Sequence, residues 1–196
     1  RVLREICRIM LIEELVSHYQ KTAGAAVSEV PKGSILGGTA DEILEMVTCY
    51  ASDAAVFLKH GDLVNAFAAS EYGLGWLDCG IYLGYTKAVF TNCLELAKEF
   101  PEELFEKLEE KTLRYQRMLT GALDGSVPAP DAETGCYAAV VKIRETAERA
   151  LAVGTELLPD DYVNALAIFS YGYGWLDCGV RAGLFQITGD RHLFTI

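Results

Sequence analysis

A segment of 23 residues occurs twice in this chain, and this internal repeat constrains the fold more than any other feature. Asp62–Gly84 recurs 99 residues later as Asp161–Gly183, with 14 of the 23 positions identical. Self-similarity at a fixed separation is typical of a duplicated structural unit. The sequence therefore predicts two copies of one module in tandem. We assign residues 1–92 to the first repeat, 93–107 to a connecting helix and 108–196 to the second repeat.

Each repeat is predicted to contain three helices and no strand. The first helix is expected over about 1–23, with its counterpart over 101–123, and loops rich in glycine and proline follow both. The second helix is expected over 39–60 in the first repeat, and a further helix over 86–100 is expected to join the repeats. No segment alternates apolar and polar residues as a half-buried strand does. The predicted fold is all-α, two tandem three-helix bundles related by approximate two-fold symmetry.

Several helix ends carry local signals. Thr39 with Glu42 three residues later forms a capping-box pattern, which satisfies two amides at a helix start. Asp62 and Asp161 stand at equivalent positions and suit the N-cap of the repeated helix. Pro101 suits a first helical turn, where its missing N–H has no partner to lose.

The repeated segment is predicted to form a buried helix. On a helical wheel of the first copy only Glu71 and Asp78 form a charged edge, and a helix this apolar is buried on most sides. It is expected at the centre of its bundle or between the repeats. Glycines inside a helix each cost about 0.5–1 kcal/mol relative to alanine, so they need a compensating role. These glycines can allow either close packing of another helix or close approach of a ligand, and the sequence leaves both roles open. The glycines expected to make helix contacts are Gly73, Gly80, Gly84, Gly172, Gly179 and Gly183.

The aspartate shared by both repeats lies in otherwise apolar surroundings. A buried carboxylate needs a partner or a raised pKa. Arg181 lies four residues after Asp177 and can supply an ion pair, whereas the first repeat has Tyr82 there. A backbone amide or hydroxyl, a basic residue from a first helix such as Arg4 or Arg114, and a bound ligand are the other partners considered.

Polar and aromatic residues of the repeat form a candidate ligand site. For the asparagines the structural alternative is closure of the helix start, and for the Tyr/Trp pairs four residues apart it is core packing. The candidate ligand-binding residues are Asn65, Tyr72, Trp76, Asp78, Asn164, Tyr171, Trp175 and Asp177.

Composition narrows the classes of function. The chain carries 28 Asp and Glu against 17 Lys and Arg, a net charge of −11, which disfavours binding to phosphate backbones. No apolar run reaches the roughly 18 residues that a membrane span needs. The six cysteines form no Cys-x-x-Cys pair and have no histidine at ligand spacing, so we expect buried thiols in a reducing cytoplasm and neither metal nor cofactor. Cys79 and Cys178 are expected to be inert.

The repeated motif resembles a known family. The pattern Gly61-Asp62-x-x-Asn65-Ala66, then Tyr72-Gly-x-Gly-Trp-Leu-Asp78 and Gly84, with the ending Phe194-Thr195-Ile196, is similar to the archaeal domain-of-unknown-function family 357. The resemblance implies a small three-helix bundle, an archaeal cytoplasmic origin and no established activity. It also implies an acidic position on the second helix, matched by Asp53. The second repeat has Arg149 at the aligned position, so any role of that acid is in doubt there.

Two functions remain open from the sequence. The first is a non-enzymatic protein-interaction or scaffolding module that pairs with itself or with another protein. It is favoured because no Walker loop, nucleophile elbow or poised histidine accompanies the motif. The second is a small-molecule or nucleotide-binding protein that uses the Asn/Tyr/Trp/Asp set of each repeat.

Overall fold

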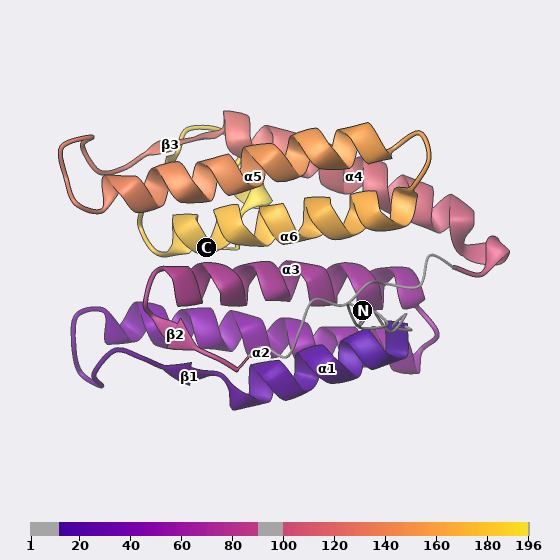
Figure 1. Cartoon of the computed structure of the whole chain (residues 1–196), viewed down its shortest axis with the longest axis horizontal. Coiled ribbons are helices and arrows are strands. Elements are labelled where there is room, and N and C mark those ends of the chain that lie inside the picture. The colour runs from indigo at the N-terminus through magenta and orange to yellow at the C-terminus, as the bar shows by residue number, and fades with distance from the viewer. Residues whose placement is uncertain (1–11, 90–99, 196) are drawn as a thin grey trace, which may run out of the picture.

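The computed structural model describes residues 12–89 and 100–195, which form two three-helix units. The all-α prediction and the tandem arrangement are confirmed (Figure 1). In the first repeat the helices are α1 Ile12–Ala25, α2 Gly37–Lys59 and α3 Leu63–Tyr82. In the second repeat they are α4 Phe105–Asp124, α5 Tyr137–Leu157 and α6 Tyr162–Arg181. No helix in the described part of the chain is long and apolar enough to cross a membrane.

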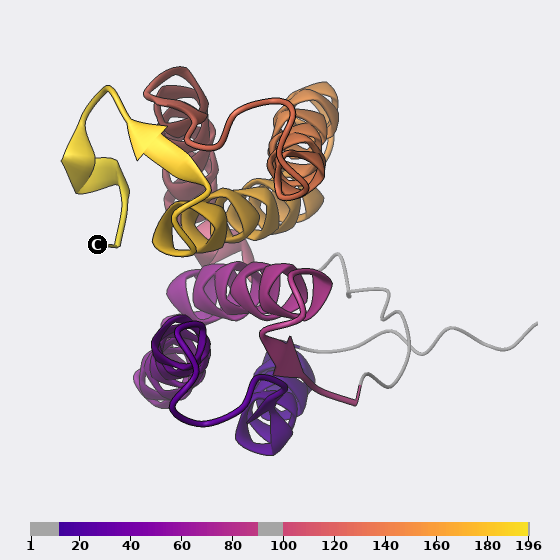
Figure 2. The ribbon, with the colours of Figure 1, turned by 90° about the vertical axis from the view of Figure 1, so that its left-hand side faces the viewer.

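The last helix of each unit lies at the centre of the molecule. Figures 1 and 2 show α3 and α6 against each other, with α1 and α2 on one outer side and α4 and α5 on the other. Side chains such as Phe67, Trp76 and Leu166 on these two helices have no exposed surface. The prediction of a buried central helix is therefore confirmed, and α3 both completes its own bundle and contacts the other repeat.

A short antiparallel ribbon closes each unit. In the first repeat β1 Val27–Ser28 pairs with β2 Thr86–Lys87, with Ser28 opposite Thr86. In the second, β3 Ser126–Pro128 pairs with β4 Phe185–Ile187. The prediction of no strand, and of a helix starting at residue 86, was wrong at these positions. Strands of two or three residues are too short to show an alternating pattern.

The helix ends confirm some capping predictions and correct others. The side chains of Asp62 and Asp161 each accept a hydrogen bond from the backbone N–H three residues later, at 3.2 and 3.0 Å. The capping box at Thr39 was wrong, because α2 already begins at Gly37 and its N-cap, Leu36, makes no side-chain bond.

The segment that joins the repeats is only partly described. Residues 93–99 of the predicted connecting helix, and residues 1–11 of the predicted first helix, lie outside the described residues. Within the remainder, Pro101 is extended and precedes a 3₁₀ turn, Glu102–Leu104, that leads into α4. Pro101 is therefore the cap of a short turn rather than part of an α-helix.

Contacts around the repeated glycines show which residues of the two units are equivalent. Ile43 lies against Gly80, and Ile143 lies against Gly179 in the same way. Tyr19 similarly lies against Gly73, and Leu119 against Gly172. These pairs place α1 and α2 at an offset of 100 residues from α4 and α5.

The alignment made from sequence was therefore wrong in the outer helices. The pairing of Asp53 with Arg149 assumed an offset of 96 residues, whereas Tyr19 has Leu119 as its structural counterpart, 100 residues later. At the same offset the counterpart of Asp53 is Val153 and not Arg149. The sequences of the outer helices have diverged so far that they do not reveal the correct alignment.

Candidate functional site

The repeated tyrosines and aspartates meet where the two repeats join. The hydroxyl of Tyr171, on α6, donates a hydrogen bond to Asp78 of α3 at 2.6 Å. The hydroxyl of Tyr72, on α3, donates likewise to Asp177 of α6. The tyrosine of each repeat thus donates a hydrogen bond to the aspartate of the other repeat. We call this contact between α3 and α6 the inter-repeat seam.

Two glycines set how close the helices come at the seam. A Cβ added at Gly75 would lie 3.2 Å from the Cα of Gly174, and one added at Gly174 would lie 3.2 Å from the Cα of Gly75. Each would also collide with a backbone carbonyl of the facing helix, that of Tyr171 or Tyr72. No side chain larger than a hydrogen atom fits without moving a backbone. A local two-fold axis through this point would produce such reciprocal contacts. Two-fold symmetry between the complete repeats stays a prediction.

Four of the glycines expected to make helix contacts pack inside their own repeat. A Cβ at Gly80 would lie 2.9 Å from Ile43 of α2, and one at Gly179 would lie 3.1 Å from Ile143 of α5. Gly73 and Gly172 similarly leave room for side chains of the outer helices. The seam glycines, Gly75 and Gly174, were missed as a contact pair, although their repetition in the motif was the available signal.

Gly84 and Gly183 do not make the predicted helix contacts. Both lie just beyond the ends of α3 and α6, with φ of +74° and +75°, and nothing stands within 4 Å of an added Cβ. The N–H of Tyr85 bonds to the carbonyl of Gly80 at 2.9 Å, and that of Gly84 to Ile81 at 3.0 Å. This pair of bonds is a Schellman motif, which requires a left-handed residue after the helix. These glycines therefore end the helices.

Asp177 is sealed inside the protein. Its side chain has no exposed surface, and it accepts hydrogen bonds from the Tyr72 hydroxyl and from the backbone N–H and hydroxyl of Thr195, the N–H lying at 3.2 Å. Burial raises the pKa of Asp177, and these hydrogen bonds offset only part of that effect. The predicted pairing with Arg181 was wrong, because that guanidinium bonds to Glu42 at 2.9 Å.

Asp78 has a more open environment than its counterpart. It is half-buried, and Tyr171 is its hydrogen-bond donor among the described residues. Burial raises the pKa of Asp78, and the bond from Tyr171 partly offsets the shift. Glu71, two turns earlier on α3, has its pKa raised to about 7, first by burial and then by the charge of Asp78. The second repeat has Ser170 in place of Glu71, so the two ends of the seam differ in charge.

The predicted aromatic residues belong to the core around the seam. Trp76 has no exposed surface, and the ring of Trp175 lies 5.7 Å from that of Tyr82 across the seam. The ring of Tyr72 packs against Tyr50 at 4.6 Å. The indole N–H groups of both tryptophans are buried without a hydrogen bond to any described residue. Of the four predicted aromatic residues, Tyr72, Trp76 and Trp175 are buried and Tyr171 is partly buried, so they pack in the core around the seam.

The two asparagines lie apart from this cluster. Asn65 and Asn164 stand in the first turns of α3 and α6, and their side-chain amides donate to Asp62 and Asp161 at 2.6 and 2.5 Å. The Asp62 carboxylate also binds Lys107 at 2.8 Å. These contacts close the helix starts, as the structural alternative for the asparagines predicts.

The four cysteines among the described residues lie in two kinds of environment. Cys79 and Cys178 are buried at the seam, and burial raises the pKa of the Cys79 thiol, with a further contribution from neighbouring Cys178. Cys49 and Cys136 are exposed, so the expectation of buried thiols was wrong for them. Among the described residues, no three Asp, Glu, His or Cys side chains converge as a metal site.

Both repeats match the model of one protein family. The model of the family described as Protein of unknown function (DUF357) matches residues 18–86 and 114–185, which is more than half of the sequence. The chain belongs to the DUF357 family. Each matched region runs from a first helix to the strand after the third, so each repeat is one DUF357 unit. No curated protein and no solved structure matches the chain.

Proposed function

We propose that this DUF357 protein is a non-enzymatic interaction or scaffolding module, in which the shared motif joins two units into one body. The observation that carries the proposal is the reciprocal pairing of Tyr72 with Asp177 and of Tyr171 with Asp78. Residues that sequence analysis assigned to a possible ligand are engaged with the other repeat. Because the motif residues contact the other repeat, they favour a role for the motif in pairing DUF357 units.

The chemistry of the paired groups supports the same proposal. Burial first, and then the charge of the facing aspartate, raises the pKa of Tyr72 and of Tyr171. Both phenols therefore stay protonated and act as hydrogen-bond donors. A tyrosine that acts as a nucleophile or general base would need a pKa lowered toward neutrality, whereas the pKa of both these tyrosines is raised.

A small-molecule function is the second candidate, and one observation favours it. At one end of the seam Glu71 and Asp78 keep some exposed surface, whereas Asp177 at the other end keeps none. Two carboxyl groups on the same side of α3 disfavour binding of a phosphate, so a nucleotide is the ligand least suited to this place. A cationic or neutral polar molecule fits it better.

We also infer a reducing compartment such as the cytoplasm. The observation in favour is the pair of free, exposed thiols, Cys49 and Cys136, on different repeats. Exposed free cysteines are typical of proteins kept in a reducing environment.

Native mass spectrometry of the protein purified from its own cells tests the proposed function. We expect the intact chain without added small-molecule mass, together with a larger complex that contains a second polypeptide or a second copy. Glu71→Ser, which reproduces the residue of the second repeat, serves as the matched variant. A stoichiometric small molecule that is retained by the native protein and lost in Glu71→Ser would favour the second candidate instead.

A further inference from the structure

Two cysteines occupy equivalent positions in the inter-repeat seam. Cys79 lies on α3 one turn after Gly75, and Cys178 lies on α6 one turn after Gly174. Both are free thiols, and neither residue has any exposed surface. The tyrosine–aspartate pairs do not involve these thiols, so the pairs do not explain why both repeats carry a cysteine at this position.

The helix geometry places the two cysteines side by side. Figure 1 shows that α3 and α6 run in the same direction, from the α2–α3 and α5–α6 loops toward the two ribbons. Gly75 and Gly174 bring the two backbones into contact, and four more residues add about 6 Å along each helix. Where helices pack by their rows of residues four apart, those rows lie side by side. Cys79 and Cys178 therefore continue the contact that the glycines begin.

Two further observations place the thiols within reach of each other. Burial raises the pKa of the Cys79 thiol, and the Cys178 thiol adds to the shift, which requires the two side chains to be close. Beyond Cys79 on α3, the ring of Tyr82 still lies 5.7 Å from that of Trp175, so the helices have not separated. A disulfide needs Cα atoms within about 7 Å and side chains that point toward each other. The touching glycines provide the first condition, and the effect of one thiol on the other indicates the second.

We propose that Cys79 and Cys178 form a reversible disulfide that links the two repeats covalently under oxidising conditions. The oxidant is a small disulfide such as oxidised glutathione. One cysteine thiolate attacks it and releases one small thiol, and the second cysteine thiolate then attacks the mixed disulfide and releases the other. The protein gives up two electrons and two protons, and the small disulfide becomes two thiols.

Burial protects this pair but does not prevent the reaction. Both sulfurs are sealed in the seam, so exchange with a small disulfide begins only when the seam opens transiently. In a reducing environment the pair stays as two thiols, and a change to oxidising conditions locks α3 to α6. The link depends on the geometry of the seam and not on what the protein binds, so it goes beyond the function proposed above.

Equilibration of the full chain with mixtures of reduced and oxidised glutathione, once in the folded state and once in urea, tests the proposal. Each sample is quenched with acid, its free thiols are alkylated after unfolding, and peptide mapping by mass spectrometry identifies the linked cysteines. Because folding holds the two thiols together, we expect the folded chain to form the Cys79–Cys178 link in mixtures about tenfold or more too reducing to form it in urea. The linked chain should melt about 5–15 °C above the reduced chain, since the link restricts the unfolded state.

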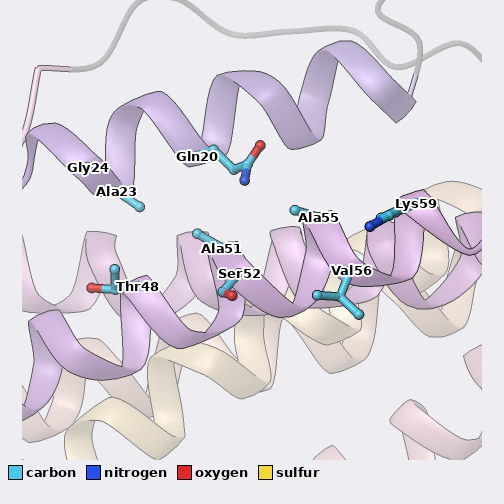
Figure 3. Close-up of a pocket in the computed structure, with 9 residues that line it drawn as sticks. All are labelled: Gln20, Ala23, Gly24, Thr48, Ala51, Ser52, Ala55, Val56 and Lys59. Carbon is cyan, nitrogen blue, oxygen red and sulfur yellow. The ribbon is translucent and has the colours of Figure 1, made fainter.

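Two variants provide the controls. Cys79→Ala should abolish both the link and the rise in melting temperature. Cys49→Ala should leave both unchanged, because this exposed thiol follows Thr48 on the outer helix α2, beside the shallow groove between α1 and α2 (Figure 3).

The contrary results are equally definite. A folded chain that forms the link no more readily than the chain in urea overturns the proposal. A linked chain that melts at or below the temperature of the reduced chain also overturns it. The comparison of folded and unfolded chains uses the unchanged sequence, so it decides the matter even if Cys79→Ala folds poorly. None of these outcomes bears on partner binding, and the proposed interaction function is tested separately.

Discussion

Gly75 and Gly174 are the points at which α3 and α6 touch, since a Cβ on either would lie 3.2 Å from the Cα of the other. Backbones approach this closely only where side chains are absent from both helices. The closeness brings each tyrosine hydroxyl within reach of the opposite aspartate. The motif glycines, tyrosines and aspartates thus act together in one contact.

Replacing a seam glycine should therefore destabilise the whole protein. We expect Gly75→Ala or Gly174→Ala to lower the free energy of unfolding by about 1–3 kcal/mol or more, because the methyl group meets backbone that cannot turn aside. Gly38→Ala is the matched control, since Gly38 lies in a helix with nothing within 4 Å, and it should gain about 0.4–1 kcal/mol. Urea unfolding measures all three. Equal effects at Gly75 and Gly38 would show that the helices do not touch there.

Asp177 should contribute more to stability than Asp78. Asp177→Ala leaves the Tyr72 hydroxyl and the Thr195 N–H buried without their acceptor, and we expect a loss of about 2–4 kcal/mol. Asp78→Ala removes one bond at a half-exposed position, with an expected loss of about 1 kcal/mol. Asp177→Asn keeps an acceptor for the Thr195 N–H, so its loss of stability should lie between those of Asp78→Ala and Asp177→Ala. Thermal melts decide the order, and an Asp78→Ala loss at least as large as that of Asp177→Ala would contradict it.

Glu71 should make stability depend on pH. Its pKa is about 7 in the folded protein against 4.5 in the unfolded chain, so its favourable contribution is complete below pH 4.5 and is lost as the pH rises through 7. We expect Glu71→Gln to be more stable than the parent by about 1–3 kcal/mol at pH 8 and equally stable at pH 4.5. Glu45→Gln, at an exposed position of α2, is the control. A Glu71→Gln effect of the same size at both pH values would refute this prediction.

Thiol labelling should separate the two classes of cysteine. Iodoacetamide should modify Cys49 and Cys136 in the native protein, and Cys79 and Cys178 only after unfolding, because both of the latter are buried out of reach of the reagent. For Cys79, burial also raises the pKa of the thiol and so disfavours the reactive thiolate. Peptide mapping by mass spectrometry reads the sites. Rapid labelling of Cys79 in the native state would mean that the seam opens readily.

The parts of this fold that sequence analysis predicted are those with local signals. The repeat, the buried helix and the caps at Asp62 and Asp161 follow from residues close together in the chain. The β1–β2 and β3–β4 ribbons did not, because two or three residues carry too little pattern. The register of the outer helices was missed because Tyr19 and Leu119 hold the same place with different chemistry.

The candidate site was predicted as a set of residues but not as an arrangement. Nothing local links Tyr72 to Asp177, which lies 105 residues away, or excludes the nearer Arg181 as its partner. Such pairings depend on how α3 meets α6. Gly75 and Gly174 mark the point where the helices cross, but this role is recognisable only when both helices are placed against each other.

The central claim is that the motif joins the two repeats, and a double-mutant cycle across the seam tests it most directly. Tyr171 and Asp78 come from different repeats and are joined by a hydrogen bond of 2.6 Å. The stabilities of Tyr171→Phe, Asp78→Ala and the double variant, measured by urea unfolding, give their interaction energy. We predict a favourable coupling of about 0.5–3 kcal/mol, as expected for residues in contact. Additive losses, with a coupling near zero, would contradict the claim.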